Sequence, residues 1–278
     1  MSKFLTDVLA HTFLQYALLT GILAGVACGV IGTFVVVRKI TYIAGGISHT
    51  VLGGMGAALY LRAFGWDGME PLYGAIVSAL AAALIIGVVS LKAREREDTV
   101  IGAIWAVGMA AGILFVSQTP GYNTDLMSYL FGNILMVSSQ DLWLLAGLDV
   151  IVVLTALIFY NQFLAVCFDN EFARLRGLNV EAYYLLLLCL TALTVVVLVT
   201  VVGIVLVIAL LTLPTAIAGF FSRSLGQMMV LSAGLCMALT SAGLALSYGP
   251  DLPAGATTIL LAAVAYLGIL LGKRIMAS

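Results

Sequence analysis

Long apolar runs dominate the chain, and short polar stretches separate them. A helix of about 20 apolar residues crosses a bilayer. By that criterion nine segments are candidate spans, at residues 13–37, 42–61, 71–91, 99–116, 142–160, 183–201, 203–221, 227–247 and 256–272. Almost nothing separates the sixth segment from the seventh around Val202 and Gly203, so the two also fit one broken helix. The pattern predicts an all-α polytopic helical bundle of eight or nine spans, as a single transmembrane domain over residues 1–278.

Residues 125–137 fit neither a span nor an ordinary loop. The stretch is too short to cross a bilayer and too apolar for a plain exposed connection. We expect a re-entrant or interfacial helix on the outer side of the membrane.

Composition supports a membrane protein and excludes some other classes. The 278 residues are 63% hydrophobic and 9% charged, with a mean hydropathy of +1.18, whereas a soluble protein carries about 25% charged residues. The net charge of −1 gives no basic excess for binding nucleic acid. The cysteines stand singly, without a CxxC pair, and are predicted to be buried hydrophobic side chains rather than a thiolate metal site: Cys28, Cys167, Cys189 and Cys236.

Arginine and lysine positions predict the orientation, because they gather in cytoplasmic loops. With nine spans, ten of the 12 basic residues fall on one side, at Arg38, Lys39, Lys92, Arg94, Arg96, Arg174, Arg176, Arg223, Lys273 and Arg274. Lys3 and Arg62 fall on the other side. We therefore expect an outer N-terminus and a cytoplasmic C-terminus.

The longest cytoplasmic connection is predicted at residues 161–182. Within it, Phe172, Leu175 and Leu178 recur at helical spacing beside acidic and basic residues. This predicts a short amphipathic helix on the cytoplasmic face, ended by Gly177 as its C-cap. Such a helix either docks a cytoplasmic partner or only anchors a loop at the membrane surface.

Two ionisable residues lie inside apolar segments, where they are costly and usually face the bundle interior or a water-filled path. His49 lies about two turns into the second segment, next to Ser48 and between two glycine pairs. A neutral imidazole is a good ligand for zinc, manganese or iron; the alternative is a histidine that bonds to a neighbouring helix. Asp149 lies about two turns into the fifth segment, where it marks a pathway, pairs with a polar neighbour or lies closer to the interface.

The sequence contains no arrangement that predicts catalysis. It has no nucleophile–base pattern of the serine-hydrolase type and no phosphate-binding GxxxxGK[ST] motif. The chain itself is therefore not predicted to be an enzyme. If ATP drives the transport, another chain must hydrolyse it.

Five segments carry a family resemblance. The first is FLQYALLTGILAGVACGVIGTFVVVRKITYIAGGISHTVLGG, whose characteristic residues are Gly32, Val36, Arg38, Ser48, His49 and Gly53. The others are DLMSYLFGNILMVSSQDL, FDNEFARLRGLNV, LLTLPTAIA and PAGATTIL, at residues 125–142, 168–180, 210–218 and 253–260. In this order they cover nearly the whole chain, and they resemble the permease subunits of ATP-binding-cassette importers for zinc, manganese and iron.

The resemblance implies a type II importer-like permease in the inner or plasma membrane of a bacterium. It implies a homodimer, two cytoplasmic ATPase subunits that bind ATP, and an extracytoplasmic metal-binding protein. The chain itself would hold no cofactor, and its cargo would be a divalent metal ion moved by alternating access. His49 and Ser48 would line the path. Coupling to the ATPase would involve Asp169, Glu171, Phe172, Ala173, Arg174 and Gly177.

One position departs from the family pattern and keeps alternatives open. Many members of the resembled family carry an aspartate one helical turn before the histidine, and this chain has Gly45 there. An ATP-driven importer of a metal chelate, such as a siderophore or a corrinoid, is therefore a first alternative. A secondary transporter or channel is the second alternative. Paired intramembrane charges and nested repeats would favour it, but the sequence shows neither. A purely structural role is disfavoured by the polar, glycine-rich second segment.

Overall fold

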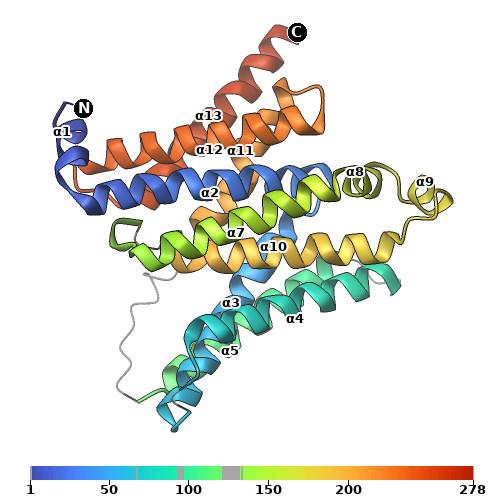
Figure 1. The fold of residues 1–278 in the computed structure, drawn as a ribbon, viewed down its shortest axis with the longest axis horizontal. Helices are drawn as coiled ribbons and strands as arrows, with labels where there is room; N and C mark the ends of the chain where they lie inside the picture. Colours follow the sequence, from blue (N-terminus) through green and yellow to red (C-terminus); the bar gives the residue numbers. More distant parts are fainter. Residues whose placement is uncertain (1, 67, 93–96, 121–131, 133, 278) are drawn as a thin grey trace.

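The computed structural model describes residues 2–66, 68–92, 97–120, 132 and 134–277, and these form an all-helical bundle without strands (Figure 1). The helices are α1 (Ser2–Ala10), α2 (Thr12–Val37), α3 (Thr41–Ala63), α4 (Pro71–Lys92), α5 (Glu97–Gln118), η1 (Ile134–Met136), α7 (Ser139–Ile158), α8 (Tyr160–Phe168), α9 (Asn170–Leu175), α10 (Val180–Val202), α11 (Ile204–Phe221), α12 (Leu225–Tyr248) and α13 (Ala254–Ala277). The prediction of an all-α polytopic bundle is confirmed.

The number of spans agrees with the predicted eight or nine. Within the described residues, eight helices are long and apolar enough to cross a membrane: α2, α4, α5, α7, α10, α11, α12 and α13. The 23-residue α3 is long enough as well, but its glycines and the Ser48-His49-Thr50 run make it more polar. Polar groups in a membrane helix are tolerated where the helix is enclosed by protein. Twelve α3 residues are indeed buried, and α3 packs between α4 and α5.

The sixth and seventh segments are separate helices. Gly203 lies between α10 and α11 with φ +85°, a conformation that favours glycine and interrupts the helix. Gly132, also at positive φ, packs its backbone against the Val202–Gly203 peptide, where a Cβ atom would collide with the backbone of Val202. The predicted re-entrant segment at 125–137 lies mostly outside the described residues, and only its end is seen, as the short η1.

Close helix contacts in the bundle depend on small residues, as expected where lipid gives no hydrophobic drive for helix association. Gly21, Gly25 and Gly29 of α2 face α12, and a Cβ at Gly29 would lie 2.6 Å from the Cα of Ala233. On the other side of the molecule, a Cβ at Gly53 of α3 would lie 2.8 Å from the carbonyl oxygen of Gly108 in α5. Helix α2 lies at the centre, in contact with α7, α11 and α12, while α3, α4 and α5 form a group below it that packs against α10 (Figure 1).

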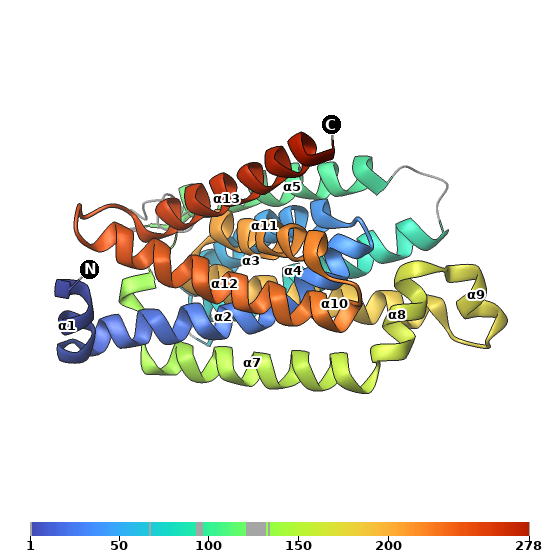
Figure 2. The same cartoon turned by 90° about the horizontal axis from the view of Figure 1, so that it is seen from above.

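The two ends of the bundle differ in charge. Successive long helices run in opposite directions, so α8 and α9 lie at one end, the α9 end, and α1 lies at the opposite end, the α1 end (Figure 2). The turns at 38–40 and 222–224 also lie at the α9 end, and Lys273 of α13 reaches the same place, donating to the carbonyl oxygen of Phe220 at 2.9 Å. Those basic residues of the predicted cytoplasmic group that the structure describes thus lie in elements at one end of the bundle.

Candidate functional site

His49 is buried in α3, with 8% of its surface exposed. Its ring stacks on the indole of Trp105 from α5, with ring centroids 4.5 Å apart and an interplanar angle of 15°. Nδ1 is buried and has no hydrogen-bond partner among the described residues. Nδ1 therefore does not bond to a neighbouring helix, contrary to the alternative interpretation of His49. The imidazole ring is instead packed against the indole of Trp105.

Ser48 is fully buried but does not pair with His49. Its hydroxyl donates to the carbonyl oxygen of Ala44 at 2.6 Å, one turn back in the same helix. Thr50 does the same toward Gly46, at 2.8 Å. Such back-bonding satisfies a hydroxyl locally and leaves the imidazole as the polar group of this turn without a partner.

Gly45 lies one turn before His49 and faces the same indole. A Cβ atom at Gly45 would lie 3.0 Å from Cζ3 of Trp105. The indole therefore fills the space that a larger side chain at this position would need. Sequence reasoning missed Trp105 because it is 56 positions beyond His49 in the chain, in a helix whose pattern showed only apolar character.

No group of three or more histidine, cysteine, aspartate or glutamate side chains gathers for a metal in the part of the chain that the structure describes. His49 is thus a single imidazole within one copy of the chain. Zinc in structural sites takes four ligands and in catalytic sites three from the protein. A complete site around His49 would need ligands from outside this set.

Asp149 lies near the middle of α7, which packs on α2. The residue is 8% exposed, and neither carboxylate oxygen has a hydrogen-bond partner among the described residues. The pairing with a polar neighbour that the sequence left open is therefore wrong for this conformation, while the place of Asp149 relative to the membrane interface stays a prediction. Asp149 is an unpaired carboxyl group at the α2–α7 contact.

The cysteines behave as the sequence predicted. All four are free thiols; Cys28, Cys167 and Cys236 are buried, and Cys189 is half-buried. Burial raises the pKa of the Cys167 thiol in α8 to about 11, although the positive charge of Arg38 acts in the opposite direction. Cys167 therefore stays protonated near neutral pH, which removes it as a thiolate ligand or nucleophile.

A short helix, α9, is present in the predicted connection, and its ends are specified locally. The Asp169 side chain caps its start, accepting from the backbone N–H groups of Glu171 and Phe172, each at 3.0 Å. Gly177 follows its end with φ +75°, and its N–H donates to the Arg174 carbonyl oxygen at 2.9 Å. The N–H of Leu178 then donates to the Ala173 carbonyl oxygen at 3.1 Å, which completes a Schellman motif.

The prediction for residues 161–182 was incomplete, because two helices lie there rather than one. Helix α8 precedes α9 and buries Phe163, Val166 and Cys167 at helical spacing. Phe163 packs edge-on against Phe34 of α2, with centroids 5.2 Å apart. The predicted connection contains the residues of α8 from 161 onward, but the sequence predicts a helix there only around Phe172, Leu175 and Leu178.

Arg38 joins four helices at this end. It follows α2, and its Nη1 donates to the carbonyl oxygen of Val166 in α8 at 2.9 Å. In the amide orientation that satisfies both neighbours, Asn170 of α9 accepts from Nη2 at 2.8 Å. The guanidinium also lies over the Tyr184 ring of α10, 5.4 Å from its centroid. Because α3 begins three residues after Arg38, this side chain links α9 to the helix that carries His49.

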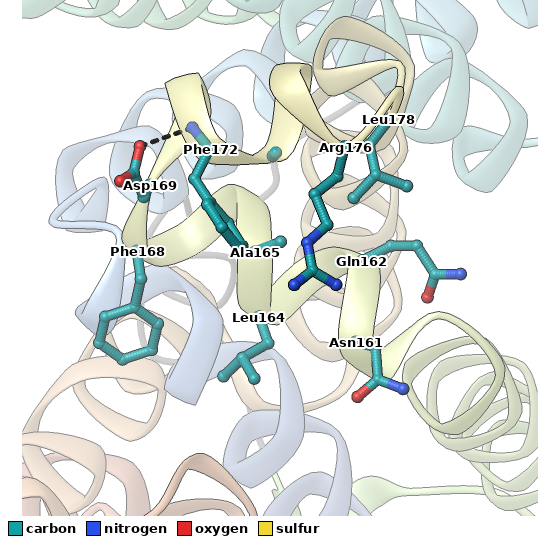
Figure 3. Close-up of a pocket in the computed structure, with 10 residues that line it drawn as sticks. Asn161, Gln162, Leu164, Ala165, Phe168, Asp169, Phe172, Arg176 and Leu178 are labelled. Atoms are coloured by element: carbon teal, nitrogen blue, oxygen red, sulfur yellow. Dashed lines mark hydrogen bonds between the residues drawn. The ribbon is translucent and has the colours of Figure 1, made fainter.

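A pocket of about 690 Å³ opens between α8, α9 and the start of the following turn (Figure 3). Asp169, Phe172 and Ala173 line it, and Arg176 extends into it with its guanidinium 4.9 Å from the centroid of the Phe172 ring. Among the predicted coupling residues, Ala173 is fully buried and Phe172 is 49% exposed. Leu175 is 88% exposed, so the apolar face of α9 is only partly covered by this chain.

Of the predicted coupling residues, Arg174 forms an ion pair at the surface with Glu181, a residue outside the predicted set. Arg174 donates from Nη2 to Oε1 of Glu181 at 2.8 Å, with the two side chains 58% and 50% exposed. Glu171 lies in the first turn of α9. The structure therefore brings the six predicted coupling residues together at the α9 end and places His49 and Ser48 apart from them, within α3.

Comparison with known proteins identifies the family to which this chain is related. The ABC 3 transport family model matches residues 10–273. The chain is 43% identical over 259 residues to a probable metal transport system membrane protein of Chlamydia muridarum, covering 93% of this chain and 88% of the relative. It is 38% identical over 264 residues to the manganese transport system membrane protein MntC of Listeria monocytogenes, covering 95% and 91%.

A solved structure supports the same relationship. The chain is similar to one from PsaBC of Streptococcus pneumoniae in complex with a Fab, with a TM-score of 0.84 and 33% identity. The likeness covers 96% of this chain and 94% of that one. The match along nearly the entire sequence, with the same fold, shows that this chain belongs to the ABC 3 transport family.

Proposed function

We propose that this chain is the membrane-spanning permease subunit of an ATP-driven importer for a divalent metal ion. The observation that carries the proposal is the family match over residues 10–273, in which relatives are named for metal and manganese transport. The chain contributes the path and the movement, and ATP is hydrolysed on a separate ATPase chain. The metal is cargo and not a resident cofactor.

The proposed path passes His49. The imidazole is the polar group of the α3 interior whose Nδ1 has no partner among the described residues, and the neighbouring Ser48 is already bonded within its helix. A single imidazole is too few ligands for a zinc or manganese site. We infer that a second copy of the chain supplies another His49 across a two-fold axis, and that an extracytoplasmic binding protein delivers the ion.

The proposed docking surface for the ATPase is the α9 end. The basic residues gather there, and basic residues favour the cytoplasmic side, so this end and the C-terminus face the cytoplasm. Leu175 and Phe172 expose apolar surface beside the 690 Å³ pocket, as expected of a surface that a partner covers. Arg38 would then carry a displacement of α9 to the start of α3.

A metal chelate is a second candidate cargo. It is favoured by Gly45 and by the lack of a three-ligand group in the described residues, since a chelated metal needs fewer protein ligands. A gradient-driven transporter or channel is the alternative of another class, and it would need no ATPase.

Reconstitution separates these functions. The chain is placed in proteoliposomes with an ATPase and a binding protein from its own genome, and uptake of zinc, manganese and iron is measured with and without ATP. The proposal predicts uptake that stops when ATP or the ATPase is omitted. Uptake that persists without ATP would establish the gradient-driven class, and ATP hydrolysis stimulated only by a chelate would establish that cargo.

A docking variant tests the α9 surface separately. Leu175→Asp changes a side chain that is 88% exposed, so the isolated chain should keep its stability, while association with the ATPase should weaken by about tenfold or more. Leu252→Asp is the matched control, because Leu252 is 52% exposed at the α1 end. Equal co-purification of the ATPase with both variants would contradict docking at α9.

A further inference from the structure

Trp105 has a relation to α3 that the proposed path does not explain. Its indole contacts two successive turns of one α3 face, stacking on His49 at 4.5 Å between centroids and filling the space beside Gly45, where a Cβ would lie 3.0 Å from Cζ3. Residues four apart on a helix share a face, so one aromatic ring covers both positions. Gly45 permits this approach because it has no side chain.

A metal-binding histidine is usually held by a hydrogen bond from its second nitrogen to a carboxylate, a carbonyl or water. His49 lacks that support, because Nδ1 is buried without a partner among the described residues. The stacked indole supplies a different restraint. The lone pairs of imidazole lie in the ring plane, so a ring stacked at 15° fixes that plane and leaves the nitrogen edges unobstructed by the indole.

We propose that Trp105 is the positioning residue for His49 and that the Gly45–Trp105 pair sets the metal preference of the path. The inference rests on the proposed function, since it assigns a role to His49 as a ligand for the cargo. The indole takes the place of a side chain at position 45 and so leaves no room there for a carboxylate. The path then presents imidazole nitrogen without a carboxylate.

The chemistry of the ligands gives the direction of the preference. Imidazole suits zinc and other metals late in the first transition row, whereas carboxylate and carbonyl oxygen suit manganese. An imidazole path without a carboxylate therefore favours zinc over manganese. Introducing a carboxylate one turn before His49, on the same face, shifts the preference toward manganese.

The exchange Gly45→Asp with Trp105→Ala tests this assignment, because removal of the indole makes room for the new carboxylate. Uptake of zinc and manganese is measured in proteoliposomes with the ATPase and the binding protein. The expected result is a rise of about tenfold or more in the manganese-to-zinc uptake ratio. Trp143→Phe is the control, since Trp143 is 79% exposed on α7, and it should leave the ratio unchanged. An unchanged ratio in the double variant, with transport intact, would overturn the inference, whereas a wild-type complex that moves no metal would overturn the proposed function instead.

A spectroscopic measurement avoids dependence on the double variant. The chain has three tryptophans, so Trp66→Phe with Trp143→Phe leaves Trp105 as the sole indole fluorophore. The full-length protein in lipid nanodiscs is titrated with cobalt alone, a nitrogen-preferring metal that quenches indole fluorescence. We expect saturable quenching that disappears in a further His49→Ala variant. Two results would show that Trp105 does not support a metal ligand. One is quenching that persists in the His49→Ala variant, and the other is no quenching in a protein that still transports metal.

Discussion

The α9 end and the His49 turn of α3 are built on opposite principles. At the α9 end, polar groups are paired: Asp169 caps α9, and Arg38 binds Val166 and Asn170. At the His49 turn, the imidazole is buried with an unpaired Nδ1 and is held by an aromatic face. The paired region has a fixed shape, and the unpaired one has unused binding capacity.

The difference indicates a division of labour. Paired hydrogen bonds rigidify a local structure, which suits an element that must transmit the movement of a partner. An unpaired polar group inside a membrane helix is costly and is usually functional. Variants at the α9 end should therefore change coupling or docking, and variants at the His49 turn should change which ion passes and how fast.

The largest effect is expected from His49→Ala. Changes in residues that only support a metal ligand cost about 10–100-fold, so loss of the ligand itself should lower metal uptake by at least about 100-fold. The variant should still fold and bind the ATPase, because α9 lies far from His49 along the chain and its hydrogen bonds do not involve His49. His11→Ala, at an exposed histidine of the α1 end, is the control and should transport normally. Uptake at the wild-type rate in His49→Ala would remove His49 from the path.

Arg38→Ala should have the next largest effect. The variant leaves the Val166 carbonyl and the Asn170 amide without a charged donor, and hydrogen bonds to charged groups contribute about 1.5–3 kcal/mol each. We expect ATP hydrolysis to continue while metal uptake per ATP falls several-fold, as measured in the same proteoliposomes. Arg38→Lys keeps the positive charge but cannot bond to Val166 and Asn170 through two guanidinium nitrogens. Its metal uptake per ATP should lie between that of wild type and that of Arg38→Ala. An unchanged ratio of metal to ATP would mean that α9 and α3 communicate by another route.

A smaller effect is expected at the end of α9. Gly177 has φ +75°, so Gly177→Ala should cost about 1 kcal/mol by straining the Schellman motif. Gly249→Ala is a matched control, because Gly249 also follows a helix but has φ −69°, and an added Cβ meets no described atom within 4 Å at either glycine. Thermal unfolding of the detergent-solubilised protein should separate the two variants. Equal melting temperatures would show that the motif contributes nothing.

The smallest effect is expected at the Arg174–Glu181 ion pair. Both side chains are at least half exposed, and pairs of this kind contribute about 0.5 kcal/mol or less. Arg174→Ala should therefore leave stability nearly unchanged at 150 mM salt. A loss of ATPase binding without a loss of stability would assign Arg174 to the docking surface, whereas a large drop in melting temperature would contradict the assignment of the pair as a weak surface contact.

The contrast between the two regions also explains which structural features could be predicted from the sequence. The long helices follow from apolar runs, and the limits of α9 follow from Asp169 and Gly177, because caps act within a few residues. Trp105 could not be found this way, since its contact with His49 depends on how α5 packs against α3. Helix α8 was missed within the predicted connection because its burial depends on packing against α2, as in the contact between Phe163 and Phe34.

One measurement tests the division of labour most directly: metal uptake and ATPase association measured on the same preparations of wild type, His49→Ala and Leu175→Asp. His49→Ala is expected to keep the ATPase and lose uptake, and Leu175→Asp is expected to lose the ATPase together with uptake. A His49→Ala complex that transports metal at the wild-type rate would contradict the central claim. So would a Leu175→Asp chain that retains both its ATPase and its transport.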